Sequence, residues 1–352
     1  MKSLPVILIL LTAANIIAAE KKIIRDTDRF ELVYTMKLPE LNASGKLWIP
    51  LARTDPYQRF ETLSISSPIP WHKTRDKIHH NEILVLHPDQ TASGQQITIR
   101  YLVTRKEKSA HTETGNPKKH LKAEKLVPIN ARFIQMAKKI TATSANDLDK
   151  GKAIYKHVLE HMRYDKSGKG WGRGDALYAC DSRIGNCTDF HAYFIALCRA
   201  INIPARFAIG FTIPASQNEG IIDGYHCWAE FHAGGNWVPV DISEADQNPE
   251  LSDYYFGHHP ANRLELSRGR DILPKPAPKT PPPSVYPNSC FISKGPVSCA
   301  CEVVLISKRK KNGIINFVFQ RLTMIFSEKR SGFVFKGISA TEHSIMCISR
   351  IL

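Results

Sequence analysis

The stretch Gly185-Asn186-Cys187-Thr188-Asp189 comes directly before an apolar run, Phe190–Ala200, that predicts a helix. A cysteine at a helix start faces unpaired backbone N–H groups and the positive end of the helix dipole. Both favour the thiolate, which is the nucleophilic form of the side chain. A buried structural cysteine is the alternative interpretation of this stretch alone. The pattern therefore offers Cys187 as a candidate nucleophile that needs partners elsewhere in the chain.

Two later blocks carry the partners that a nucleophilic thiol needs. His226-Cys227-Trp228-Ala229-Glu230 and Trp237-Val238-Pro239-Val240-Asp241 lie in runs that predict strands over 226–232 and 236–242. A hairpin around Gly234-Gly235 would bring His226 and Asp241 to the same end. A carboxylate can then orient the imidazole while the other ring nitrogen faces the thiol. Each residue alone is commonly structural, but the three in this order favour a catalytic triad.

These blocks resemble the core of the transglutaminase-like superfamily, and in particular its exported bacterial-type members. The same holds for the run from Leu197 to Arg206 and for Ile209-Gly210-Phe211, so the resemblance covers about residues 125–273. It implies Cys187 as nucleophile, His226 as general base and acid, and Asp241 as orienting acid. It also implies a papain-like core, with the helix that carries the cysteine packed on an antiparallel sheet that carries His and Asp.

An acyl-transfer enzyme also needs donors for the oxyanion, each typically worth about 3–4 kcal/mol. The backbone N–H of Cys187 is one candidate. The resemblance implies an aromatic side chain upstream of the cysteine as the other, and Arg163-Tyr164-Asp165 is similar to that segment. We therefore expect the Tyr164 hydroxyl to be the second donor. Trp171 is the alternative donor, and core packing at a helix end is the structural interpretation of Tyr164.

The spacing of the remaining candidates does not favour a metal or a phosphate site. Cys180 and Cys187 are separated by six residues, whereas structural zinc sites use pairs separated by about two to four. Cys299 and Cys301 are too close together for ordinary zinc spacing. The glycine-rich loop Gly168–Gly174 lacks the Lys-Ser/Thr that follows a phosphate-binding loop. The sequence predicts no metal and no organic cofactor.

The net charge of +15 is concentrated at one end of the chain. Residues 274–352 hold 12 Lys and Arg against 3 acids and so contribute +9 of the +15. The other residues carry +6, which needs no polyanionic partner to explain it. We therefore expect no nucleic-acid partner for the core. The alternative is a membrane-surface or nucleic-acid tail built on Lys308–Lys311.

The N-terminus has the order of a secretory signal. One lysine is followed by the apolar run Leu4–Leu11 and by small residues that end near Ala19. We expect export to the periplasm or beyond, with cleavage near Ala18 or Ala19 and no stable membrane span afterwards. Retention of Leu4–Ala19 as an anchor is the alternative.

Composition divides the chain into five segments. Residues 1–19 are the predicted signal peptide, and 20–105 show strand runs with turn residues between them, as in a small β-sandwich. Residues 106–124 are polar and read as a linker. Residues 125–273 form the predicted catalytic domain, of α+β class. Residues 274–352 are rich in proline and then basic, and we expect them to be poorly ordered and to carry none of the chemistry.

Together these features predict an enzyme that attacks an amide carbonyl of a peptide or protein and forms a thioester acyl-enzyme. Water as acceptor would make it a protease or amidase, which is the favoured outcome. An amine as acceptor would make it a cross-linking transglutaminase. A non-catalytic envelope binding or scaffold protein is a third possibility, which the complete triad disfavours. The oligomeric state is left open.

Overall fold

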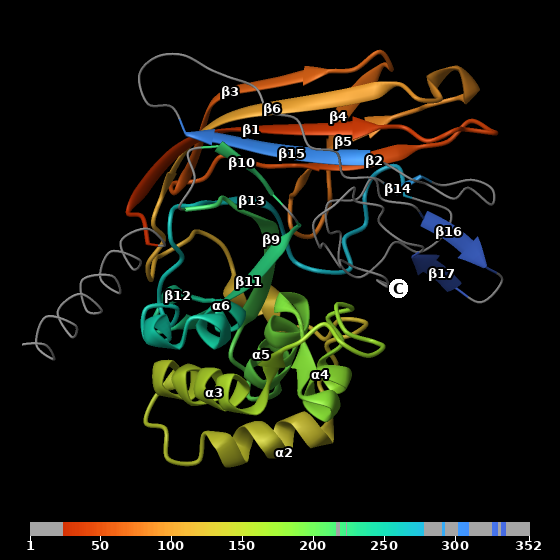
Figure 1. The fold of residues 1–352 in the computed structure, drawn as a ribbon. Coiled ribbons are helices and arrows are strands. Elements are labelled where there is room, and N and C mark those ends of the chain that lie inside the picture. Colours follow the sequence, from red (N-terminus) through yellow and green to blue (C-terminus); the bar gives the residue numbers. More distant parts are fainter. Residues whose placement is uncertain are drawn as a thin grey trace, which may run out of the picture.

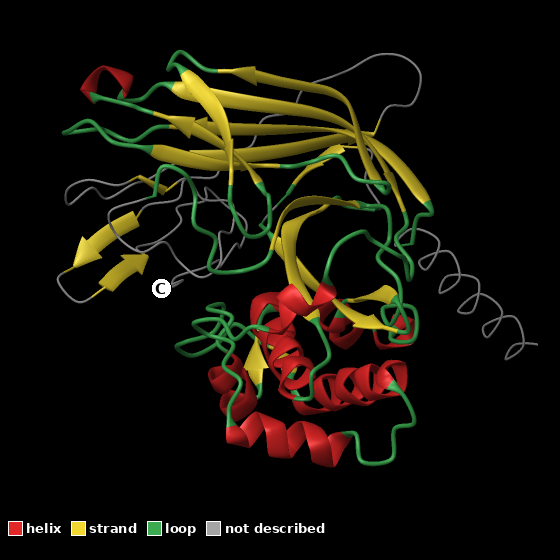
Figure 2. Ribbon diagram, turned by 180° about the vertical axis from the view of Figure 1, so that it is seen from behind, coloured by secondary structure: helices red, strands yellow, loops and turns green. Residues whose placement is uncertain are grey.

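The computed structural model describes residues 24–215, 219–222 and 224–277, and four short strands at 291–292, 302–309, 326–329 and 332–335. The predicted signal peptide lies outside these residues. Strands gather at one end of the molecule and helices at the other (Figure 1), and the view from behind shows the same separation (Figure 2). Within the described part of the chain, no helix is long and apolar enough to cross a membrane.

The N-terminal part consists of two antiparallel sheets. Its own strands are β1 (Thr27–Lys37), β2 (Leu47–Leu51), β3 (Gln58–Ser66), β4 (Trp71–Arg75), β5 (Glu82–Leu86) and β6 (Gln96–Lys106), with a 3-10 turn η1 (Gln90–Ala92). One sheet contains β1, β6 and β3, and the other contains β2, β5 and β4. Apolar side chains of both sheets share one hydrophobic cluster. The sequence missed β4 because its five side chains are largely exposed and show no alternation of apolar residues.

Strands from the region after Pro274 complete these sheets. β15 (Glu302–Arg309) lies antiparallel beside β1, and β10 (Glu219–Ile221) pairs with the other side of β15. β14 (Phe291–Ile292) pairs with β2, while β16 (Phe326–Lys329) and β17 (Gly332–Phe335) pair with each other. These four segments of the region expected to be poorly ordered form strands. Four apolar or β-branched residues of β15, Val303 to Ile306, suit a strand, but the partner that gives them a register is β1, far away in sequence.

The second part packs helices on a four-stranded sheet of order β12-β11-β9-β13. The strands are β9 (Ala205–Thr212), β11 (His226–Ala233), β12 (Asn236–Val240) and β13 (Arg263–Arg268), and the short pair β7 (Arg163–Tyr164) and β8 (Ile184–Gly185) lies beside them. The helices are α2 (Ala131–Ile140), α3 (Asp147–His161), α4 (Ala176–Ser182), α5 (Cys187–Ala200) and α6 (Ile242–Gln247), with 3-10 turns η2 (Pro117–Leu121) and η3 (Pro249–Leu251). The predicted α+β class is confirmed.

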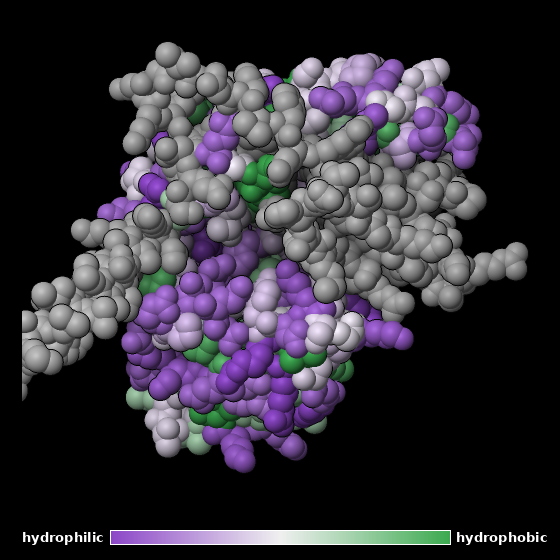
Figure 3. Space-filling model, in the orientation of Figure 1, coloured by the Kyte–Doolittle hydropathy of each residue, from purple (hydrophilic) through white to green (hydrophobic). Residues whose placement is uncertain are grey.

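Helix α5 is the centre of this second part. Every one of its residues is buried, and it packs against β9 and β11 as well as against α2, α3, α4 and α6. The apolar faces of α2 and α3 are turned towards it. The surface of the helical part in Figure 3 is accordingly mostly hydrophilic, with apolar residues at scattered positions. The residue that starts α5 is therefore held from several sides.

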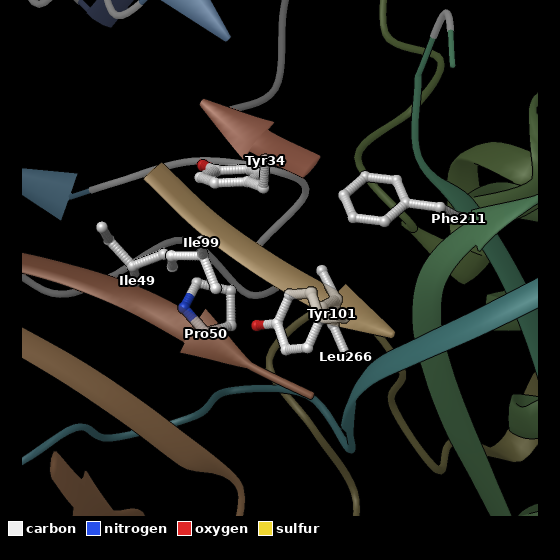
Figure 4. A pocket seen from close by; sticks show the side chains of 7 residues that line it. All are labelled: Tyr34, Ile49, Pro50, Ile99, Tyr101, Phe211 and Leu266. Atoms are coloured by element: carbon white, nitrogen blue, oxygen red, sulfur yellow. The ribbon is translucent and has the colours of Figure 1, made fainter. Parts of the chain in front are cut away.

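The two parts share a continuous interior. Figure 4 shows Phe211 of β9 and Leu266 of β13 among side chains of the N-terminal sheets, which are Tyr34, Ile49, Pro50, Ile99 and Tyr101. They surround a cavity of about 10 Å³. A cavity of this size holds one water at most. It is a gap in the packing between the two parts and has no room for a ligand.

Residues 106–124, expected to be a linker, pack against both parts. The ammonium of Lys108 is fully buried and lies 3.1 Å from a carboxylate oxygen of Glu230 and 3.4 Å from one of Glu265. Arg206 and Arg268 pair with the same two acids from the other side. Burying charges is tolerated where each has an opposite partner. The segment joins the two parts, and the exact domain boundaries stay a prediction.

We expect a chain that ends at Ala277 to unfold at a lower temperature than one that ends at Arg309, which keeps β15. Without β15 the edge of β1 loses its backbone partner, and each kcal/mol lost lowers Tm by about 2–4 °C in domains of some 200 residues. Calorimetry of the two chains measures the difference. Alkylation of Cys187 in each chain checks that α5 is still folded, since α5 packs in the other part. Equal Tm values would contradict a structural role of β15.

Candidate active site

The start of α5 is held by a reciprocal cap. The Asn186 side chain accepts a hydrogen bond from the Thr188 N–H at 2.9 Å, and the Asp189 carboxylate accepts from the Asn186 N–H at 3.0 Å. Asp189 also accepts from the N–H groups of two glycines in the loop before α4, Gly172 and Gly174. A capping box of this kind pairs donors that a helix start leaves free. It places Cys187 as the first residue of α5.

Gly185 leaves room for this cap. A Cβ on Gly185 would lie 2.5 Å from an Asp189 carboxylate oxygen, which is closer than such atoms can approach. The glycine is therefore required by the close approach of the Asp189 side chain. In the stretch Gly185-Asn186-Cys187-Thr188-Asp189, four residues thus serve to hold the helix start, and the buried Cys187 is held between them.

His226 and Asp241 meet through the predicted hairpin. β11 pairs with β12 around the Gly234-Gly235 turn, with Ala229 opposite Val240. The His226 Nε2 atom lies 2.7 Å from the Asp241 Oδ2 atom. The strand ends at Val240, two residues earlier than expected, because Asp241 caps helix α6. Its Oδ1 atom accepts from the N–H of Glu244 at 3.2 Å.

Arg263 completes the environment of the Asp241 carboxylate. Its Nη1 atom donates to the Asp241 Oδ2 atom at 3.0 Å, and both side chains are almost fully buried. Burial alone would raise the pKa of Asp241. The charges of His226 and Arg263, with the hydrogen bond from His226, outweigh burial and hold that pKa below its usual range. The carboxylate is therefore ionised at neutral pH.

Cys187 and His226 are neighbours that affect each other's ionisation, and because His226 Nε2 contacts Asp241, Nδ1 is the ring nitrogen left for the thiol. Burial opposes ionisation of the Cys187 thiol, but hydrogen bonds from Cys227 and His226 and the nearby imidazole charge lower its pKa well below the ordinary value. Burial likewise opposes the charge on His226. The charge of Asp241 and the hydrogen bonds to Asp241 and Cys187 raise the pKa of His226 well above its ordinary value. The pair is a thiolate and an imidazolium.

A second histidine braces the same site. His191 is fully buried, with its Nδ1 atom 2.7 Å from the Cys187 carbonyl oxygen and its Nε2 atom 3.1 Å from the Ile242 nitrogen. A backbone N–H can only donate, so Nε2 accepts and Nδ1 carries the proton. Burial lowers the pKa of His191, in keeping with a neutral ring. His191 therefore links the backbone at Cys187 to the residue after Asp241.

A second thiol also lies beside the first. The Cys227 side chain is fully buried beside Cys187, and its Sγ atom is 3.4 Å from the Oγ1 atom of Thr188, the residue after Cys187. Burial, together with the nearby Cys187 thiolate, raises the pKa of Cys227 well above its ordinary value. Cys227 is therefore a neutral thiol next to a charged one.

A cavity of about 280 Å³ opens over the nucleophile. Its lining includes Cys187 and His226, together with residues from the start of α5, from β7, and from the region between β9 and β11. The full set is Tyr164, Lys166, Asn186, Cys187, Thr212, Pro214, Ile221, Ile222, Gly224, Tyr225 and His226. The Tyr225 hydroxyl accepts from the Asn186 side-chain amide at 2.9 Å, which ties this wall to the helix cap. Space of this size accommodates one or two side chains of a substrate.

Tyr164 lines this cavity, and Trp171 does not. In the pairing of β7 with β8, Tyr164 lies opposite Gly185, two residues before the nucleophile. Its N–H donates to Asp246 at 2.7 Å, and its ring is 6.4 Å from that of Phe190. The backbone contacts of Tyr164 therefore set its ring beside the start of α5. Trp171 is buried away from the cavity.

The structure brings together Cys187, His226 and Asp241, and the fourth residue predicted from the sequence, Tyr164, lines the same cavity. Their catalytic roles stay predictions. The sequence analysis missed Arg263, His191 and Cys227 as neighbours of these groups. His191 had a signal, since it lies one turn after Cys187 on the same helix, and Cys227 follows His226 directly. Among the described residues, no group of three or more His, Cys, Asp or Glu is placed to hold a metal ion.

Comparison with known proteins agrees with this geometry. Residues 134–242 match the sequence profile of the transglutaminase-like superfamily. The chain contains a transglutaminase-like core. That core holds α2, α3, α5, β9 and the hairpin of β11 and β12, and so includes all three residues of the predicted triad.

Three known proteins are similar to this chain. An uncharacterised protein of Haemophilus influenzae is 24% identical over 302 residues, which cover 72% of this chain and 82% of that protein. The crystal structure of a candidate cysteine protease from Cytophaga hutchinsonii has a TM-score of 0.55 at 16% identity, over 88% of this chain and 98% of that one. The periplasmic domain of TgpA from Pseudomonas aeruginosa has a TM-score of 0.35 at 18% identity, over 63% and 90%. At 16% identity, the likeness to the Cytophaga hutchinsonii structure is one of fold alone.

We expect iodoacetamide to alkylate Cys187 with a midpoint well below pH 8.5, about the value of an ordinary thiol. The charge of Asp241 stabilises the His226 imidazolium and, through it, the Cys187 thiolate, so Asp241→Asn should raise the pH midpoint of alkylation. Two other titratable groups face these charges: His191 lies beside Asp241, and Glu244 lies beside His226. Peptide mapping of alkylation against pH measures both. Cys198, whose pKa burial raises, is the internal reference. Labelling of Cys187 no faster than that of Cys198 would sink the thiolate assignment.

Proposed function

We propose that this protein hydrolyses amide bonds of peptides or proteins through a thioester on Cys187. The observation that supports it most is the buried 2.7 Å contact between His226 and Asp241, beside a cavity that Cys187 lines. An orienting carboxylate, an imidazole and a thiolate in this order are the parts of a nucleophilic cysteine site. The transglutaminase-like core is a fold of cysteine-dependent hydrolases and acyltransferases, and the water acceptor is our proposal.

In the first half of the reaction, the Cys187 thiolate attacks the carbonyl carbon and the C=O electrons move to oxygen. When the tetrahedral intermediate collapses, the C–N bond breaks and the His226 imidazolium gives its Nδ1 proton to the leaving amine. In the second half, neutral His226 takes a proton from water, which attacks the thioester. The acid leaves and the thiolate returns. Asp241 keeps the imidazole in the required orientation throughout.

The oxyanion is placed between two donors in this proposal. The Cys187 N–H lies at the start of α5, where the helix dipole favours negative charge. The Tyr164 hydroxyl, from β7 in the lining of the same cavity, is the second donor. Donors held by a helix cap and by a backbone pairing need little rearrangement as the charge develops.

Cys187→Ala should abolish turnover of a peptide amide library, while its Tm stays close to that of the wild type. Asp241→Asn should lower kcat/KM by a factor on the order of 10³–10⁴, because the imidazole loses its orienting charge. Asp253→Asn, an exposed carboxylate after α6, is the matched control and should change nothing. Adding a primary amine shows whether water or an amine takes the acyl group. If transfer to the amine exceeds hydrolysis, the activity is cross-linking and not hydrolysis. A wild-type protein that is inert towards every amide would contradict the proposal.

Tyr164→Phe should lower kcat by about 10²–10³ with little change in KM, since an oxyanion donor acts in the transition state. The ring and its packing on Phe190 remain in the variant, so only the hydroxyl is tested. Tyr178→Phe on α4, away from the cavity lining, serves as the control. Unchanged kcat in Tyr164→Phe would return Tyr164 to a packing role.

We further propose that the protein acts in the periplasm or outside the cell. Support comes only from the order of lysine, apolar run and small residues over 1–19. The purified mature protein should begin near Glu20 when its N-terminus is sequenced. A start at Met1 in protein from the membrane fraction would favour the retained anchor.

A further inference from the structure

Cys227 has a position that the proposed hydrolysis does not require. It sits on β11 directly after the triad histidine, fully buried, with its thiol next to that of Cys187. The Thr188 hydroxyl, 3.4 Å from the Cys227 Sγ atom, holds it from the helix side. Two thiols in contact, one of them a thiolate, are the starting point for a disulfide.

We propose that Cys187 and Cys227 form a modification site, at which Cys227 captures oxidised Cys187 as an intramolecular disulfide and so protects the nucleophile reversibly. The oxidant is a hydroperoxide, small enough to enter the 280 Å³ cavity that Cys187 lines. This inference rests on the proposed role of Cys187 as nucleophile. It adds a second, redox reaction of the same sulfur atom.

The first step is attack of the Cys187 thiolate on one oxygen of the hydroperoxide. The O–O bond breaks, hydroxide or alkoxide leaves, and Cys187 becomes a sulfenic acid. In the second step the Cys227 sulfur attacks the Cys187 sulfur, the S–O bond breaks, and water leaves with the Cys227 proton. In total the two thiols lose two electrons. The hydroperoxide is reduced to water and an alcohol, or to two waters where it is hydrogen peroxide.

The charges around Cys227 suit the second step. Its thiol is kept neutral by burial and by the neighbouring thiolate charge. When Cys187 becomes a neutral sulfenic acid, that charge is gone and Cys227 ionises more readily. Resolution therefore becomes favourable only after the first oxidation. A dithiol in reducing conditions stays reduced, since exchange with small thiols reverses the bond.

The other described cysteines are poorly placed for this capture. Cys198 lies on the same helix eleven residues later, which is about 16 Å along the axis. Cys180 accepts from the Arg132 guanidinium at 3.3 Å and interacts with the Tyr193 hydroxyl. Both are engaged elsewhere, whereas Cys227 is in contact with the sulfur to be captured. Cys198 is therefore a matched control, since it is a buried thiol in the same core.

The test compares wild type, Cys227→Ala, Cys227→Ser and Cys198→Ala, each treated with hydrogen peroxide, quenched with catalase and then divided. One half is digested under non-reducing conditions for peptide mapping. The other half is reduced with dithiothreitol, and alkylation of Cys187 and amide turnover are measured relative to each variant's own untreated value. Tm of every variant confirms that it folds, and the serine variant keeps the size of the thiol.

In wild type and Cys198→Ala we expect a linked Cys187–Cys227 peptide and recovery of about nine-tenths of Cys187 alkylation after reduction. In both Cys227 variants we expect sulfinic and sulfonic Cys187, which thiols do not reduce, and at least about a fivefold lower recovery. Cys187 linked to another cysteine, or equal recovery in all variants, would overturn the proposal. The peptide map and the alkylation of Cys187 do not need amide turnover. A protein without hydrolase activity would therefore contradict the proposed function, while the disulfide proposal could still be tested.

Discussion

The carboxylate of Asp241 is the group on which both the fold and the chemistry depend. It is fully buried, and a lone carboxylate in such a place is strongly destabilising. Its Oδ2 atom accepts from His226 and Arg263, and its Oδ1 atom caps α6. One oxygen therefore serves the proposed triad and the other starts a helix. The residue that orients the imidazole is itself held by Arg263 and by the start of α6, which keeps the site rigid.

The N-terminal sheets serve this site from a distance. Arg263 and Glu265 lie on β13, and the Gln58 side chain of β3 hydrogen-bonds to the backbone at Glu265. The same strand ends in the buried cluster around Lys108, where each charge has an opposite partner. Removing one charge from such a cluster leaves another unpaired and costs about 3–5 kcal/mol. Contacts with the N-terminal part thus hold β13 in place, and with it Arg263, whose charge neutralises that of Asp241.

The sequence predicts well those structural features that depend on residues close together in the chain. The Asn186 cap, the helix at Cys187 and the turn at Gly234-Gly235 depend on short stretches, and from them the meeting of His226 with Asp241 follows. Contacts between distant segments left no such signal. Arg263 lies 22 residues beyond Asp241, on a strand whose polar and apolar residues alternate although every one of them is buried, so the sequence does not show that its charged residues point into the interior. β15 gains its register from β1, and composition alone contains no trace of that pairing.

The charges of the site form an alternating row: thiolate, imidazolium, carboxylate and guanidinium, from Cys187 through His226 and Asp241 to Arg263. Because the row sums to zero, burial costs less than four separate charges would. Acylation of Cys187 would remove the first charge and with it one cause of the raised pKa of His226, namely the thiolate. The imidazole would then hold its proton less tightly, at the step where it must act as a base towards water. The same four side chains can therefore supply an acid for the first half of the reaction and a base for the second, with no movement of the backbone.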